Sequence, residues 1–159
     1  TSDDASFWME QAQKAMGFSG DWTHIGMVDH DGRVLDILLT ENTVRSWPLE
    51  FIFTDNCHAR VLRPAYATPD HRERALSWAR AQIGQVTYDW RFSLESDDAL
   101  YCQEFVQKAL RRGGIEVSAG NVYGLKEFVS ADQFSEHPRI EERWSTGSNF
   151  WLNWLSKVT

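Results

Sequence analysis

Hydrophobic and polar residues alternate with a period of two along much of the first half of the chain, which is typical of β-strands with one buried face. This alternation predicts strands over residues 24–28, 33–39, 43–47 and 60–63. The intervening sequence Asp-His-Asp-Gly at 29–32 predicts a hairpin, because Asp-Gly suits the positive φ values of tight turns. Residues 49–53 are apolar without a clear period, so their type stays open.

Apolar residues recur with helical spacing in three other segments. They predict helices over residues 7–18, from Pro69 to about residue 83, and from near Cys102 to the Gly113-Gly114 pair. The buried side of the second helix is expected to carry Ala75, Leu76, Trp78, Ala79 and Ile83. On the third helix the face shared by Cys102, Phe105, Val106 and Ala109 is apolar, so we expect the thiol to point toward the sheet.

The remaining segments add little regular pattern. Residues 85–97 are predicted to form a loop rich in polar and aromatic side chains, and the apolar segment 150–155 is expected to dock on the body. No repeat, low-complexity tract or linker divides the chain. We therefore predict a single α+β domain over residues 1–159, of which the part 116–159 is the hardest to interpret.

Composition narrows the classes of function. The 159 residues are 42% hydrophobic and 25% charged, which is ordinary for a globular domain, and the net charge is −7. An acidic chain does not favour nucleic acid or anionic lipid as a partner. No apolar run approaches the roughly 20 residues of a membrane-spanning helix. The chain starts at Thr1 without a visible signal peptide, so a removed leader and a trimmed start both stay open.

The two cysteines differ in their surroundings. Cys57 lies in a polar, turn-like stretch, and no CxxC or His/Cys cluster has zinc spacing, so the sequence predicts no metal site. Cys102 stands where the third helix begins, at the positive end of the helix dipole, which favours the reactive thiolate. Its backbone N–H is also a suitable donor for an oxyanion.

A histidine and a carboxylate could complete a nucleophilic site around this thiol. His24 and Asp36 lie on the two strands of the predicted hairpin, so they can be near neighbours. Asp36 would orient the imidazole, His24 would take the proton of Cys102, and the thiolate would form a thioester acyl-enzyme. Each residue also has a structural interpretation: Cys102 as a core residue, His24 as a hydrogen-bonded strand end, and Asp36 as a strand-edge carboxylate.

Several segments of the chain resemble a known family. Residues 84–92, GQVTYDWRF, and 97–106, DDALYCQEFV, resemble the "G-x-x-Y-D-x-x-F … Y-C-S-E-L-V" segment of the circularly permuted NlpC-type papain-like hydrolases, the YiiX/YaeF-like group. The sequence Thr-His-Ile-Gly-Met-Val at 23–28 resembles its "S-H-x-G" strand. Residues 34–36 and 44–49 resemble its "V-hydrophobic-E-A … V-x-x-x-P-L" stretch. The resemblance covers roughly residues 5–115, in the permuted order of histidine, acid and cysteine.

This resemblance implies a permuted papain-like fold, with a small antiparallel sheet or half-barrel packed against the cysteine helix. It implies Cys102 as nucleophile, His24 as general base and Asp36 as the orienting acid, with no cofactor and no metal. The family has Glu at the position of Asp36, and its shorter side chain leaves Glu41 as the fallback for the third role. Tyr88 matches a tyrosine near the site, and Gln103 replaces the family's Ser; both are candidates for substrate or oxyanion support.

The resemblance implies a bacterial cysteine hydrolase that cleaves an amide, with a cell-wall peptide or an acyl amide as substrate. One alternative is a lipid-directed thiol acyl hydrolase or acyltransferase, and another is a non-catalytic module that binds a ligand on the same fold. The eight Trp and nine Phe could line an apolar groove or fill the core. The family and the start at Thr1 predict a periplasmic or secreted protein, and the sequence does not indicate the oligomeric state.

Overall fold

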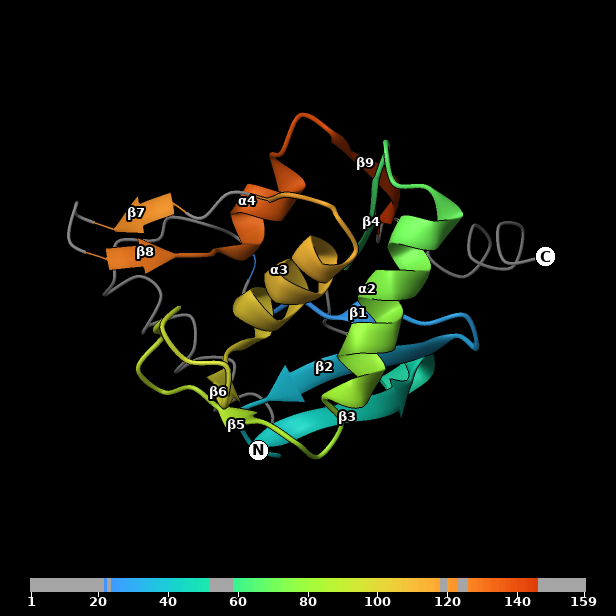
Figure 1. Ribbon diagram of the computed structural model, residues 1–159. Helices are drawn as coiled ribbons and strands as arrows, with labels where there is room; N and C mark the ends of the chain where they lie inside the picture. The colour runs from blue at the N-terminus through green and yellow to red at the C-terminus, as the bar shows by residue number, and fades with distance from the viewer. Residues whose placement is uncertain (1–21, 23, 52–58, 118–119, 123–125, 146–159) are drawn as a thin grey trace.

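A three-stranded antiparallel sheet forms one side of the computed structural model, which describes residues 22, 24–51, 59–117, 120–122 and 126–145 (Figure 1). The predicted helix at 7–18, Cys57 and the apolar segment 150–155 lie outside these residues. The sheet has the order β1-β2-β3, with β1 at Met27–Val28, β2 at Arg33–Leu38 and β3 at Thr43–Pro48. The predicted hairpin is therefore present, with β1 paired antiparallel to β2.

The hairpin differs from its prediction at its first strand. Its loop has three residues, 30–32, because the Asp29 N–H donates to the carbonyl of Arg33, and Gly32 adopts a φ of 74°. The first strand is shorter than expected, since residues 24–26 precede β1 without regular strand structure. At Gly26 the backbone approaches β2 so closely that an added Cβ would lie 2.8 Å from Val34 Cγ1.

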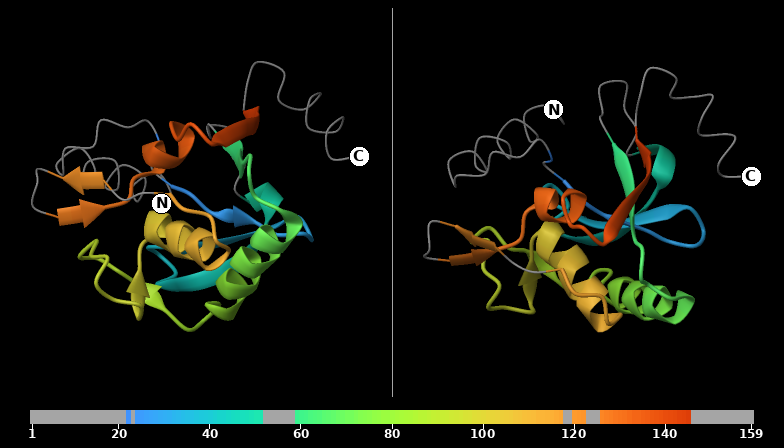
Figure 2. Two further views of the ribbon diagram at one scale, coloured as in Figure 1. Left: turned by 45° about the horizontal axis from the view of Figure 1, so that its top comes forward. Right: turned by 90° about the horizontal axis from the view of Figure 1, so that it is seen from above.

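Two helices, α2 at Pro69–Ala81 and α3 at Cys102–Arg112, pack side by side against the sheet (Figure 2). A capping box formed by Thr68 and His71 starts α2, with Pro69 at its first turn. The helix ends two residues before the predicted end, and Ile83 is therefore 41% exposed rather than buried. The close approach of the two helices requires Gly113, where a Cβ would overlap the His71 carbonyl oxygen.

The core lies between the sheet and these helices. From the sheet it contains Leu35, Ile37 and Val44, and from the expected apolar face of α3 it contains Cys102, Phe105, Val106 and Ala109. Ala75, Leu76 and Ala79 of α2 are buried, whereas Trp78 is only partly buried, against the ring of Phe105. The prediction that the thiol points inward is confirmed, because Cys102 has no exposed surface.

The remaining elements surround this core. The 3₁₀ helix η1 occupies Leu49–Phe51, and α4 occupies Ala131–Ser135. Three two-stranded sheets are formed by β4 at Arg60–Pro64 with β9 at Ile140–Ser145, by β5 at Thr87–Tyr88 with β6 at Ala99–Leu100, and by β7 at Gly120–Val122 with β8 at Lys126–Phe128. The predicted loop 85–97 thus contains a short strand, β5, that runs parallel to β6.

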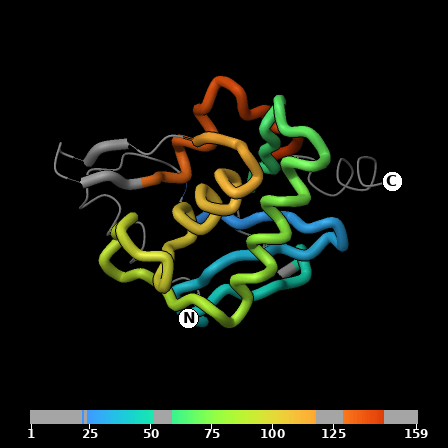
Figure 3. The backbone as a smooth tube through the Cα atoms, viewed as in Figure 1, coloured from blue at the N-terminus to red at the C-terminus, as the bar shows by residue number. Residues whose placement is uncertain are grey.

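The arrangement places an early segment of the chain beside a late one. In Figure 3 the hairpin of β1 and β2 lies next to α3, although a long stretch of chain separates them. The structure is therefore a mixed α+β fold in which the start of the cysteine helix faces the first hairpin. No helix among the described residues is long and apolar enough to cross a membrane.

Candidate active site

Cys102 is the first residue of α3 and is fully buried. The helix begins after Tyr101, which has extended backbone angles (φ −98°, ψ 166°) and makes no side-chain cap hydrogen bond. The first-turn amides have no intrahelical acceptor, so they add to the positive end of the helix dipole around the thiol. The predicted position of the cysteine at a helix N-terminus is confirmed, and it favours a negative charge on Sγ.

His24 and Asp36 are joined by a hydrogen bond of 3.0 Å between Nε2 and Oδ2. The strand register explains this contact, since Met27 pairs with Leu35 and the next position along places Gly26 beside Asp36. Gly26 has no side chain, and its α-carbon comes close to Asp36, where an added Cβ would lie 3.1 Å from the Asp36 Cβ. The glycine therefore leaves the Asp36 carboxylate open to the imidazole of His24.

The side chain of Cys102 also lies close enough to the imidazole of His24 to affect its pKa. Burial lowers the pKa of His24, but the negative charge of Cys102, the hydrogen bond to Asp36 and the charge of Asp36 together raise it to about 10. The imidazole is therefore stabilised in its protonated form. Because Nε2 binds Asp36, Nδ1 is the ring nitrogen that remains for the sulfur.

The three side chains differ in their access to solvent. The Asp36 side chain is 3% exposed and Cys102 is fully buried, whereas the His24 side chain keeps 30% of its surface exposed. The structure thus brings His24, Asp36 and Cys102 together, with the histidine at the edge that solvent reaches. This arrangement can transfer a proton from the sulfur and hold the imidazolium against a buried carboxylate.

The other candidates from the sequence lie at different distances from this group. Gln103 contacts the thiol of Cys102 directly, since its Oε1 accepts a hydrogen bond from Sγ at 2.9 Å. Tyr88 on β5 is 3% exposed, and burial followed by the charge of Cys102 raises the pKa of its phenol far above the usual range. Glu41 instead forms an ion pair of 2.9 Å with Arg45, which lies on β3.

Two residues that the sequence does not single out hold the loop beside the site. The side-chain oxygen of Asn42, which has a φ of 53°, accepts a hydrogen bond of 3.1 Å from the backbone N–H of Tyr88. Asp89 is buried and accepts from the N–H groups of Arg91 and Ser93 at 2.8 and 2.6 Å. The Tyr-Asp pair was visible as a motif, and the turn-forming hydrogen bonds of Asp89 are its physical reason.

Glu104 is a further carboxylate in the first turn of α3, and it is fully buried. Burial raises its pKa to about 7, although Lys108 lies 2.9 Å away and the backbone of Tyr101 also donates to it. Glu104 thus adds a buried carboxylate, paired with Lys108, to the first turn of the helix on which Cys102 stands.

A cavity of about 450 Å³ with a mostly apolar lining lies between the first hairpin, β4, α2 and α3, and its lining does not include His24, Asp36 or Cys102. It is bordered by Ile25, which follows His24, and by Val106, which lies one helical turn after Cys102. Leu76, Leu110 and Phe134 extend the apolar wall. Within the described part of the chain, no three His, Cys, Asp or Glu side chains are grouped as metal ligands.

Comparisons with known proteins agree with this geometry. A family model described as "Permuted papain-like amidase enzyme, YaeF/YiiX, C92 family" matches residues 7–150. The crystal structure of the metalloprotein YiiX from Escherichia coli O157:H7 superposes with a TM-score of 0.68 at 20% identity, covering 85% of this chain and 91% of that one, and this likeness shows the fold. A search of curated proteins found no match. The chain belongs to the YaeF/YiiX family of permuted papain-like amidases.

Proposed function

We propose that this protein is a cysteine amidase in which Cys102 is the nucleophile, His24 the general base and acid, and Asp36 the group that orients the imidazole. The observation that carries the proposal is the position of His24, which hydrogen-bonds to Asp36 at 3.0 Å while Cys102 is a second neighbour that raises the pKa of its imidazole. Its raised pKa supports a thiolate–imidazolium pair, the reactive form of a thiol nucleophile.

The reaction would proceed in two halves. The proton of Sγ passes to Nδ1 of His24, and the thiolate adds to the carbonyl carbon of the amide to give a tetrahedral oxyanion. The backbone N–H of Cys102 stabilises this oxyanion, with Tyr88 and Gln103 as neighbouring support. The C–N bond then breaks as the leaving amine takes the proton from His24. Water, deprotonated by His24, hydrolyses the remaining thioester and releases the acid and the thiol.

The substrate is an amide whose acyl part is either apolar or a cell-wall peptide. An apolar acyl group is supported by the mostly apolar cavity between the first hairpin and α3, which is lined by Ile25, the residue after His24, and by Val106, one helical turn after Cys102. The same cavity favours a second candidate function, a thiol acyl hydrolase or acyltransferase that acts on a lipid ester.

Mass spectrometry after incubation with three substrate classes tests the proposal. Wild-type protein and Cys102→Ala are each incubated with an N-acyl amide, with a phospholipid and with peptidoglycan stem peptides. We expect release of the fatty acid from the N-acyl amide and a trapped acyl group on Cys102 in a quenched sample. Cleavage that persists in Cys102→Ala would remove Cys102 from the mechanism. Lack of turnover on all three classes, together with ordinary thiol reactivity, would favour a binding module.

A further inference from the structure

The side-chain amide of Gln103 lies against the sulfur of Cys102 in a fully buried environment. Its Oε1 is 2.9 Å from Sγ, and the two side chains are 2% and 0% exposed. The other end of the amide, Nε2, is buried and has no hydrogen-bond partner among the described residues. A buried amide nitrogen without an acceptor is costly, so its location beside a nucleophile calls for a functional reason.

The hydrogen bond between Cys102 and Gln103 depends on the charge of the sulfur. A neutral thiol donates its proton to Oε1, whereas a thiolate has no proton to donate and repels the carbonyl oxygen. Rotation about the Cγ–Cδ bond of Gln103 exchanges Oε1 and Nε2 while the rest of the side chain stays in place. After this rotation the N–H donates to the negative sulfur, and the amide nitrogen that lacked a partner gains one.

We propose that Gln103 is a further catalytic residue, whose amide turns on ionisation of Cys102 and donates a hydrogen bond to the thiolate. The inference rests on the proposed function, because it requires Cys102 to react as a thiolate. The reactive sulfur then lies between two donors: the protonated imidazole of His24 and the Gln103 amide. When the thioester forms, the sulfur loses its charge and the amide is released.

The ionisable groups around the sulfur come from several elements. His24 precedes β1, Asp36 lies on β2, Tyr88 on β5, and Tyr101 and Glu104 belong to the start of α3. The carboxylates among them disfavour a thiolate and His24 is the cation that favours it, whereas the phenols stay neutral because burial raises their pKa far above the usual range. A neutral donor at position 103 stabilises the thiolate without adding a proton-binding group. Glutamate at this position would reverse the effect by placing a carboxylate at the sulfur.

The pH dependence of alkylation tests this role without a known substrate. The rate of carbamidomethylation by iodoacetamide is measured from pH 4 to about 10, a range that spans ordinary thiol and imidazole titration. Labelled peptides are quantified separately for Cys102 and Cys57. In Gln103→Leu and Gln103→Glu we expect the profile of Cys102 to move to higher pH, with about tenfold slower labelling at pH 6.

Gln107→Leu is the matched control. Gln107 is a second buried glutamine on α3, but its Nε2 donates to the Val117 carbonyl at 2.8 Å and does not contact the sulfur. Its substitution removes an equivalent buried amide, so we expect a similar loss of stability and an unchanged alkylation profile at Cys102. A profile that moves equally in Gln107→Leu would overturn the inference, since general loosening of the helix would then be the cause.

The outcomes also separate this inference from the proposed function. If His24→Ala slows labelling while both Gln103 variants keep the wild-type profile, Gln103 has no such role and the amidase proposal stands. If wild-type Cys102 titrates as a free thiol near pH about 8.5 and His24→Ala has no effect, both fail. Should the variants not fold, NMR of the wild type decides. As the pH is raised, the side-chain NH₂ signals of Gln103 must shift over the same range in which the ultraviolet absorbance of the thiolate appears. Signals that stay fixed over this range would refute the rotation.

Discussion

The surroundings of His24 shift the pKa of its imidazole in opposite directions, and the net shift determines its charge. Burial alone would lower the pKa of this imidazole, yet its neighbours Cys102 and Asp36 raise it to about 10. A folded-state pKa above the ordinary histidine value of 6.5 means that the native protein binds the proton more tightly than the unfolded chain does. The resulting stabilisation is fully present below pH about 6.5 and is lost as the pH rises through about 10.

Removal of either anionic neighbour is therefore expected to lower the pKa of His24. In Cys102→Ser the negative sulfur is absent, and in Asp36→Asn the carboxylate is replaced by a neutral amide, so the imidazolium loses support in both. NMR titration of the His24 ring signals would measure the change, with exposed His30 as an internal reference. An unaltered His24 titration in both variants would show that the three side chains do not interact in solution.

The sequence predicts the three site residues better than it predicts their support. His24, Asp36 and Cys102 stand out because their types and order fit a permuted thiol hydrolase, and the structure brings them together. The hydrogen bond from Tyr88 to Asn42 joins residues 46 positions apart and depends on a positive φ at Asn42, which no local pattern indicates. Hydrogen bonds of this kind depend on tertiary contacts and cannot be predicted from the spacing of residues in the sequence.

At the scale of elements, the hairpin and the two long helices follow from local signals. Alternation with Asp-Gly predicts β1 and β2, and Pro69 predicts the start of α2. The end of α2 was placed too late because Ile83 continues the apolar period, although this residue instead bridges to Val44 on β3. The pairing of β5 with β6 was missed because a two-residue parallel strand has too short a pattern to detect.

Gly26 links the hairpin geometry to the chemistry of the site. In Gly26→Ala the new methyl would lie 2.8 Å from Val34 Cγ1 and 3.1 Å from Asp36 Cβ, so the segment carrying His24 must move away from β2. We expect a loss of about 2 kcal/mol in unfolding free energy. The same displacement is expected to weaken the His24–Asp36 contact and to slow the alkylation of Cys102 near neutral pH.

Gly32→Ala at the loop of the same hairpin is the control for this prediction. An added Cβ there meets nothing within 4 Å, and the cost arises only from the φ of 74°. We expect a loss of about 1 kcal/mol with an unchanged alkylation profile. Equal slowing of alkylation in both alanine variants would contradict the proposed link between Gly26 and the site.

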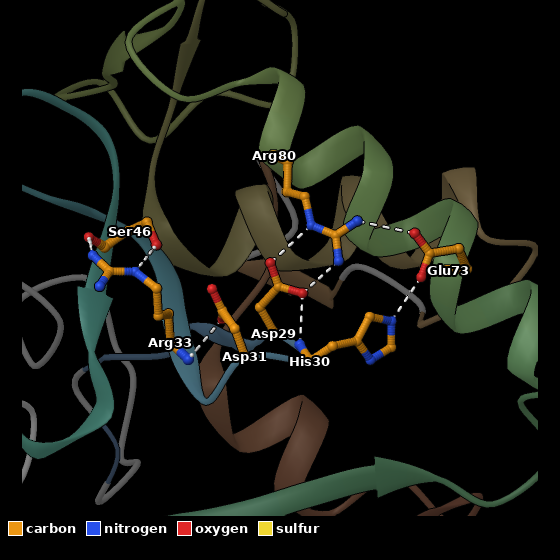
Figure 4. Close-up of polar contacts among 7 residues, drawn as sticks. All are labelled: Asp29, His30, Asp31, Arg33, Ser46, Glu73 and Arg80. Atoms are coloured by element: carbon orange, nitrogen blue, oxygen red, sulfur yellow. Dashed lines mark hydrogen bonds and ion pairs between the residues drawn. The ribbon is translucent and has the colours of Figure 1, made fainter.

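At the scale of the whole molecule, a network of ion pairs connects the hairpin loop to α2 (Figure 4). Arg80 forms two hydrogen bonds with the carboxylate of Asp29 and one of 2.9 Å with Glu73. Glu73 in turn lies 2.6 Å from Nε2 of His30. The network connects residues from distant parts of the sequence and lies at the loop end of the hairpin, whereas His24 and Asp36 lie at its other end.

Loss of this network is expected to destabilise the fold in a manner that depends on salt and pH. The hydrogen bonds from Arg80 lower the pKa of Asp29, so the pair contributes stability above the usual aspartate range and loses it as the pH falls through the lowered value. We expect Arg80→Ala to lose about 1 kcal/mol at low ionic strength and less at high salt, because Arg80 is partly exposed.

Denaturant unfolding at two salt concentrations and at acid and neutral pH would measure this loss. The difference between wild type and Arg80→Ala should shrink at acid pH, where Asp29 becomes protonated. A loss that is independent of both salt and pH would indicate that the aliphatic part of Arg80, rather than its charge, stabilises the hairpin.

The hairpin of β1 and β2 has a consequence for the order of folding. Its histidine and carboxylate are 12 positions apart and belong to one local unit, which closes with a small loss of chain entropy. The cysteine arrives from a segment synthesised much later, so its partner base and acid can already be paired when α3 docks. Under the proposed mechanism, the thiol of Cys102 therefore has only ordinary reactivity during synthesis and gains its base when the tertiary structure is complete. The proposed nucleophile would then be a product of folding, formed at its last step.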